Sequence, residues 1–108
     1  MQTLKILGQL SPSATTLTDV YTVPALTQAI VSSIAICNRS GTPTSFRVSL
    51  AVAGDADDDK QYLYYDLPIL GNDTFVATLG ISLGAGDVVR AYATLATLSF
   101  NVSGMEIS

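Results

Sequence analysis

Alternation of apolar and polar residues with a period of two runs through most of this chain, and it constrains the fold more than any other feature. The clearest segment is 46–52, in which Phe46, Val48 and Leu50 alternate with Arg47 and smaller residues. Successive side chains of a strand point to opposite faces, so this pattern is typical of a strand that buries one face. No window of ten or more residues repeats apolar positions at intervals of three and four. The sequence therefore predicts an all-β protein without a substantial helix.

About eight strands follow from this alternation and from β-branched runs. The predicted ranges are 4–7, 20–23, 29–37, 46–52, 62–67, 74–81, 88–93 and 97–102. The range 29–37 is apolar at both parities, which predicts a central strand buried on both faces. Beyond 102 the apolar positions change from even to odd numbers at Met105 and Ile107, which predicts a β-bulge near Gly104.

Many short antiparallel strands, each with one apolar face, close most naturally into two packed sheets. The predicted fold is a two-sheet antiparallel β-sandwich of jelly-roll or immunoglobulin-like topology, with a small barrel as the alternative. A chain of 108 residues is long enough to bury one core and too short for two. We therefore expect residues 1–108 to form a single domain.

Charge is sparse and acidic in this chain. Nine acidic residues and five basic ones give a net charge of −4, and the bases form no stripe that could follow a phosphate backbone. The first residues lack the continuous apolar stretch of a secretory signal, and the uncharged segment 20–38 contains Pro24 and too many hydroxyl and amide groups for a membrane span. We expect neither a nucleic-acid nor a membrane partner, and no signal peptide.

Residue types that carry catalysis are nearly missing. The chain has no histidine, which closes every serine or cysteine mechanism with an imidazole base. Its one glutamate, Glu106, falls near the end of the chain, and no tryptophan is present to stack on a sugar. Its one cysteine, Cys37, lies in an apolar run and is predicted to be a buried, inert thiol. We predict no enzymatic activity, no catalytic residues and no cofactor.

The stretch GDADDDKQYLYYD, residues 54–66, joins an acidic loop to a tyrosine-rich strand. Asp55, Asp57 and Asp59 occupy the first, third and fifth positions of an EF-hand calcium loop, but Lys60 stands where that loop needs glycine. The second half alternates like a strand and cannot wrap around an ion. The first half is interpreted as a solvent-facing hairpin loop and no metal site is assigned, while a calcium site of another type at the three aspartates stays open.

Three segments carry a resemblance to a known group of proteins: VYTVPALTQAIVSSIAICNRSGTPTSFRVSL, YLYYDLPILGNDTFVATLGISL and GDVVRAYATLATLSFNVSGMEIS. Over residues 8–107 the chain resembles small single-domain structural proteins of tailed bacteriophages and prophages. The resemblance implies a virion component made in the host cytoplasm: a head decoration or cement protein, or a neck, tail or fibre part. It also implies contacts with other virion proteins and a homo-oligomer, with a trimer favoured.

Apolar or small residues at positions of outward parity support assembly independently, because such residues could be buried against a neighbouring subunit. The positions assigned to this group are Ala29, Val31, Ala35, Ala51, Val76, Val89, Ala91 and Ala93. Scattered apolar residues are also normal on a protein surface, so this signal alone does not decide between an oligomer and a monomer.

Five residues are the candidates for the subunit interface: Tyr62, Tyr64, Tyr65, Arg47 and Arg90. For the tyrosines the alternative is packing within the sheet, with Tyr62 and Tyr64 on one face. For the arginines it is a surface ion pair with Asp66 or Asp87. A competing function is a glycan-binding receptor-recognition module on a tail fibre, in which the three tyrosines offer aromatic faces to a sugar.

Overall fold

The computed structural model describes all residues, Met1–Ser108, and contains eight strands and two short 3-10 turns. The strands are β1 (Gln2–Leu10), β2 (Thr18–Thr22), β3 (Gln28–Asn38), β4 (Thr44–Ala51), β5 (Tyr62–Ile69), β6 (Thr74–Leu83), β7 (Val88–Ala93) and β8 (Leu98–Ile107). The turns η1 (Val52–Gly54) and η2 (Asp59–Gln61) lie in the loop between β4 and β5. No helix is long and apolar enough to cross a membrane.

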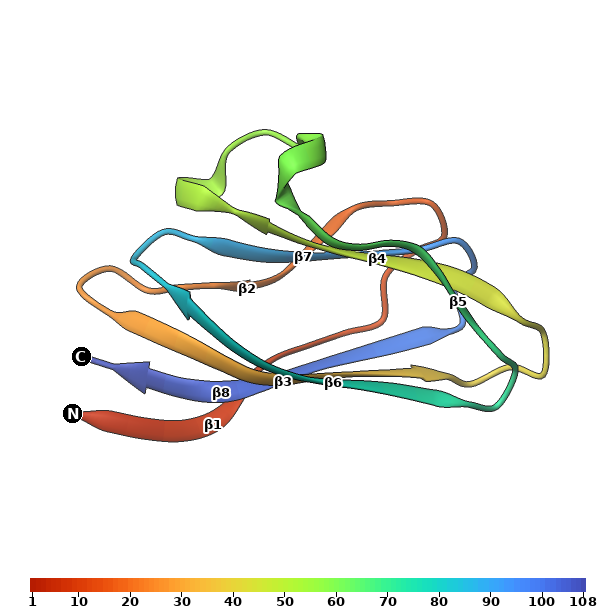
Figure 1. Ribbon diagram of the computed structural model, residues 1–108, viewed down its shortest axis with the longest axis horizontal. Coiled ribbons are helices and arrows are strands. Elements are labelled where there is room, and N and C mark those ends of the chain that lie inside the picture. The colour runs from red at the N-terminus through yellow and green to blue at the C-terminus, as the bar shows by residue number, and fades with distance from the viewer.

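The strands form two antiparallel sheets of four, with the orders β1-β8-β3-β6 and β2-β7-β4-β5. The sheets lie one above the other in Figure 1, and the β4–β5 loop rises from the outer side of the β2-β7-β4-β5 sheet. This confirms the predicted two-sheet sandwich and excludes a closed barrel. The strand order is that of an eight-stranded jelly roll, in which most consecutive strands alternate between the sheets. The two termini lie side by side, and the Ser108 amide donates a hydrogen bond to the Met1 carbonyl.

The core fills the space between the two sheets. Phe46 on β4 is fully buried, and its ring lies 5.6 to 6.2 Å from the rings of Tyr64, Phe75 and Phe100. Aromatic rings at these separations add to the free energy gained from burying their apolar area. This cluster joins β4 and β5 of one sheet to β6 and β8 of the other, and thereby fixes how the sheets face each other.

The prediction that 29–37 is buried on both faces is wrong. β3 is a central strand, but only one face of its sheet packs on the core, and alternate residues of β3 stay partly exposed. Cys37 is one of these, so the prediction of a buried thiol is also wrong. Sequence alone could not show this, because a β-branched run reads the same whether its outer face is covered by a second layer or by nothing.

The predicted bulge near Gly104 lies on the neighbouring strands instead. β8 continues its alternation through Gly104, while β3 carries an extra residue at Ser32 and β1 at Leu7. Gly104 points inward, and a Cβ there would come within 2.0 Å of the Ile30 carbonyl oxygen. The bulges therefore bring backbone so close to β8 that only glycine fits at this position.

Most of the residues assigned outward parity are in fact buried. The buried ones are Ala29, Val31, Ala51, Val89, Ala91 and Ala93. The bulge at Ser32 reverses the parity of β3 ahead of it, and β7 buries its odd-numbered residues. Ala35 and Val76 lie exposed or partly exposed on an outer face, and Ala51 also has outward parity, opposite Val88 on the side of Arg47, but is fully buried there. Most of this signal for an interface was therefore misplaced.

Candidate interaction surfaces

The outer side of the β2-β7-β4-β5 sheet, called the charged face below, holds both arginines of the predicted interface. The Arg47 guanidinium lies between the rings of Tyr65 and Tyr92, with its Cζ atom 4.1 and 4.4 Å from their centroids. It donates to both Asp66 carboxylate oxygens, from Nε at 2.6 Å and from Nη2 at 3.2 Å. These hydrogen bonds hold the pKa of Asp66 below its usual value. The ion pair predicted as an alternative for Arg47 is thus present within the chain.

Arg90 is satisfied within the chain as well, although not by the predicted Asp87. Its Nε donates to Asp19 at 3.0 Å, and its other nitrogens donate to the carbonyl oxygens of Asp55 and Gly54 at 2.8 and 3.3 Å. Arg90 thereby fastens the start of the acidic loop onto the sheet. Asp87 accepts hydrogen bonds from backbone amides of two turns instead.

The three tyrosines of β5 separate into two environments. β5 bulges twice against β4, so that Tyr64 faces the core opposite Val48 while Tyr62 lies on the outer side. The prediction that Tyr62 and Tyr64 share a face is therefore wrong. Tyr64 packs against Phe46 and Phe75 in the core, whereas Tyr62 and Tyr65 meet edge to face at 5.0 Å on the surface.

A shallow hollow of about 360 Å³ lies beside this outer pair and is lined by Asp59, Tyr62 and Tyr65. Tyr65 is 58% exposed, and one of its ring faces is covered by Arg47. The Tyr62 hydroxyl donates to Asp57 at 2.8 Å, and partial burial together with this bond raises the pKa of Tyr62 to about 12. The hollow can offer aromatic surface and one carboxylate to a polar ligand.

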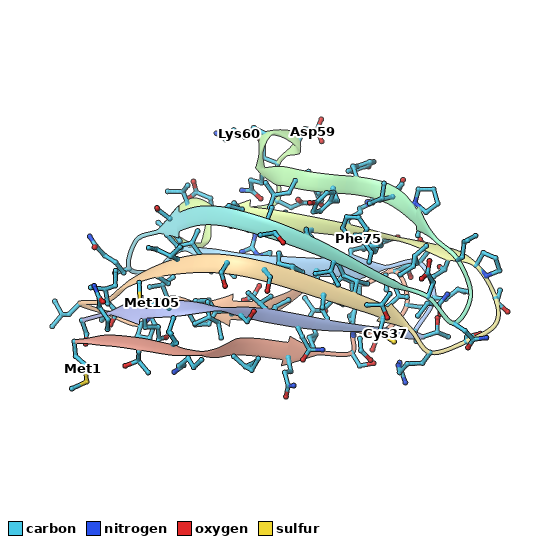
Figure 2. The ribbon with its side chains drawn as sticks, turned by 60° about the horizontal axis from the view of Figure 1, so that its bottom comes forward. Met1, Cys37, Asp59, Lys60, Phe75 and Met105 are labelled. Carbon is cyan, nitrogen blue, oxygen red and sulfur yellow. The ribbon has the colours of Figure 1, made fainter.

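Two aspartates of the acidic loop accept hydrogen bonds from residues of the same loop and of the start of β5. Asp58 accepts from the Lys60 amide as the N-cap of η2, and Asp57 holds Tyr62. No three acidic side chains converge closely enough to hold a metal ion. Figure 2 shows Asp59 and Lys60 at the tip of the loop, away from both sheets. The geometry gives no support to a calcium site here.

The outer side of the other sheet carries no charged residue at all, and we call it the uncharged face. Lys5 and Glu106 are the only charged residues in its four strands, and they pair at 3.1 Å. Glu106 also accepts a hydrogen bond of 2.6 Å from the Tyr21 hydroxyl on β2, so the pair lies on the inner side of the sheet, at its β1 edge, where the Lys5 side chain stays 46% exposed. The hydrogen bond from Tyr21 and the ion pair with Lys5 lower the pKa of Glu106.

Register defines which side chains form the uncharged face, since directly opposed residues share a face. They are Gln2, Leu4, Ile6, Gln9, Gln28, Ile30, Ser33, Ala35, Cys37, Thr74, Val76, Thr78, Ser82, Ser99, Asn101, Ser103, Met105 and Ile107. None of the five predicted interface residues is among them, although Ala35 and Val76 belong to the group of outward parity that the sequence indicated. The sequence signal for this face was the lack of charge in four strands, but it can be recognised only once their register is known.

Apolar side chains gather at one end of the uncharged face. Leu4, Met105 and Ile30 stand opposite one another on β1, β8 and β3 and form a row across the sheet. Ile6 and Ile107 flank this row. Leu4 is 81% exposed and Ile6 is 54% exposed, so this patch presents large aliphatic groups to solvent. A contiguous apolar patch without charge is typical of an interaction surface.

The rest of the uncharged face is neutral and polar. Ser33 and Ser103 bond to each other at 2.6 Å, and Gln9 donates to Asn101 at 2.7 Å. Figure 2 shows Met105 near the apolar end of β8 and Cys37 toward the opposite end of the face. A hollow of about 280 Å³ lies next to the apolar row, between the ends of β3 and β6, and Ile30, Ser82 and Ile107 help to line it.

No protein-family profile matches this chain, and no curated protein matches it either. The resemblance to structural proteins of tailed phages therefore stays a prediction.

Proposed function

We propose that this chain is a non-enzymatic structural component of a bacteriophage virion that acts by symmetric oligomerisation and by contacts with other virion proteins. The observation that carries the proposal is the uncharged face. A small acidic protein that keeps charge off one whole side of a sheet, and places exposed Leu4 and Ile6 there, has a surface suited to a protein partner.

The fold agrees with this function by analogy. Jelly rolls occur in viral capsid proteins and also in lectins. The sequence resemblance points to the first of these two groups.

Mass spectrometry of purified phage particles tests the proposed function. Particles from a bacterial strain that carries this gene should contain the chain at a fixed, symmetry-related copy number, and particles from a deletion strain should lack it. Finding the chain only in the soluble lysate, and never in particles, would count against a virion component.

A second candidate function is glycan recognition, favoured by the hollow at Asp59, Tyr62 and Tyr65. Exposed tyrosine faces stack on sugar rings, and a carboxylate at their side can accept hydrogen bonds from sugar hydroxyls. Against it, Arg47 already covers one face of Tyr65, and Asp57 already occupies the Tyr62 hydroxyl.

A glycan array probed with the full chain separates the two functions. Binding to a defined glycan that is lost in Tyr65→Ala and kept in Tyr92→Ala would favour recognition. Silence on the array, together with presence in particles, favours the structural role.

A further inference from the structure

We propose that the uncharged face is covered by a second copy of this chain, packed face to face about a twofold axis parallel to the strands. This inference rests on the proposed function and names the partner of its surface. It differs from the trimer that the sequence resemblance implies, because a twofold contact joins the same patch on both copies and closes on itself.

The area of the face suits such a pair. Four strands spaced about 4.8 Å apart and about 30 Å long present roughly 600 Å². Standard interfaces begin at about 600 Å² per partner, so full coverage of this face reaches their lower end. Because an interface at this lower end has only a few large apolar side chains to pack at its centre, we expect a weak dimer with a dissociation constant on the order of micromolar.

The arrangement of the apolar row selects the axis. An axis that runs parallel to the strands, between β8 and β3, places β8 of one copy over β3 of the other and β1 over β6. Met105 then lies over Ile30 of the second copy, because both residues belong to the same row across the sheet. An axis perpendicular to the strands would instead set the apolar end of one copy against the neutral polar end of the other.

The same axis places Leu4, the most exposed large apolar side chain of the face, beside a hollow of the second copy. Ser82 stands opposite Ile30 on β6, so it belongs to the row of Leu4 and Met105. Leu4 therefore lies over Ser82 of the second copy, beside the hollow of about 280 Å³ that Ile30 and Ser82 help to line. An exposed leucine and a hollow at matching positions give the close packing that interface cores need.

Electrostatics permits this pairing on the uncharged face and opposes it on the charged face. Each copy has a net charge of −4, but none of that charge lies on the uncharged face. No like charges are brought into contact and no ion has to be desolvated. On the other sheet, Arg47 and Arg90 already have partners in their own chain, so self-association there would have to cover existing ion pairs.

Sedimentation velocity of the full chain from about 1 to 500 µM tests the pairing, a range that brackets a micromolar dissociation constant. The wild-type protein should shift from monomer to dimer. Leu4→Glu should weaken the dimer at least about 100-fold, because each dimer buries this leucine twice and the variant brings a charge instead. Ser82→Glu should weaken it comparably, since Ser82 lies under the same leucine. Leu70→Glu is the matched control, a leucine 66% exposed in the turn between β5 and β6 and away from this face.

Each outcome decides a separate question. A wild-type dimer lost in Leu4→Glu and Ser82→Glu but kept in Leu70→Glu supports the pairing. A trimer, or a dimer indifferent to Leu4→Glu and Ser82→Glu, overturns the pairing and leaves the proposed virion function standing. A monomer at every concentration overturns the pairing as well. Only absence of the chain from purified particles would overturn the virion function. Failure of the pairing and failure of the proposed function can therefore be distinguished.

Discussion

The two outer faces of this sandwich differ in whether their side chains find partners within the chain. The charged face places Arg47 and Arg90 among carboxylates, tyrosine rings and loop carbonyls, so that its polar groups are satisfied within the chain. The uncharged face has no ion and leaves Leu4 and Ile6 in water. Arginine and tyrosine, the residue types most often associated with interfaces, can therefore serve to stabilise a single chain. The face without charged residues is the one whose apolar side chains have no partner within the chain.

The largest expected effect concerns the backbone that supports the uncharged face. Gly104→Ala should lower the free energy of unfolding by about 2 to 3 kcal/mol, because the added Cβ meets the Ile30 carbonyl oxygen and forces β3 and β8 apart. Gly80→Ala, on β6 of the same sheet, is the control, since a Cβ there has no neighbour within 4 Å. Its effect should stay within about 0.5 kcal/mol in urea denaturation. Equal effects of the two substitutions would refute the close approach at Gly104.

A smaller effect separates the faces directly. Arg47→Lys keeps the charge but loses the planar group that stacks on Tyr65 and Tyr92, and it should cost about 1 kcal/mol. The solution mass should not change, because this residue belongs to the charged face. Leu4→Glu should do the opposite. It should lower the solution mass by weakening the dimer, while the free energy of unfolding of the dilute monomer stays within about 0.5 kcal/mol of wild type. A change of oligomeric state in Arg47→Lys would support the prediction from the sequence that Arg47 lies in the subunit interface.

The smallest effect is a pH dependence at the edge of the sandwich. The pKa of Glu106 is lower in the folded protein, so its contribution to stability is present above its unfolded pKa of about 4.3 and is lost as the pH falls through the folded value. Glu106→Gln should therefore be less stable than wild type near neutral pH, and the difference should vanish in acid. Tyr21→Phe, which removes the hydrogen bond to Glu106, should move the acid transition to higher pH. Denaturation curves that keep a constant offset at all pH values would contradict this linkage.

Much of the fold could be predicted from the sequence because one apolar face per strand dictates a sandwich. The alternation in β4 and β8 located those strands, and the prediction of eight strands in two sheets is confirmed. For some strands the sequence did not reveal which face is buried, because this depends on β-bulges. One extra residue at Ser32 inverts which side of β3 is buried, and nothing in the residue types marks it.

The candidate surface was harder to predict for the same reason. The sequence could predict the pairing of Arg47 with Asp66, because the two lie 19 positions apart on neighbouring strands. It could not predict the pairing of Arg90 with Asp19, which lies 71 positions away. The uncharged face needs the register of four strands that come from the whole length of the chain. Residues such as Leu4 and Met105 look unremarkable alone and become a patch only when β1 and β8 are aligned.

The reaction rate of the Cys37 thiol shows whether a second copy covers the uncharged face. This free thiol is partly exposed and lies on the uncharged face, far from the apolar row, so a second copy that covers the whole face must also cover Cys37. Its rate of modification by a maleimide should fall as the protein concentration rises through the range in which the mass doubles, and Leu4→Glu should restore the fast rate. A thiol that reacts at the same rate in monomer and dimer would show that the copies meet elsewhere.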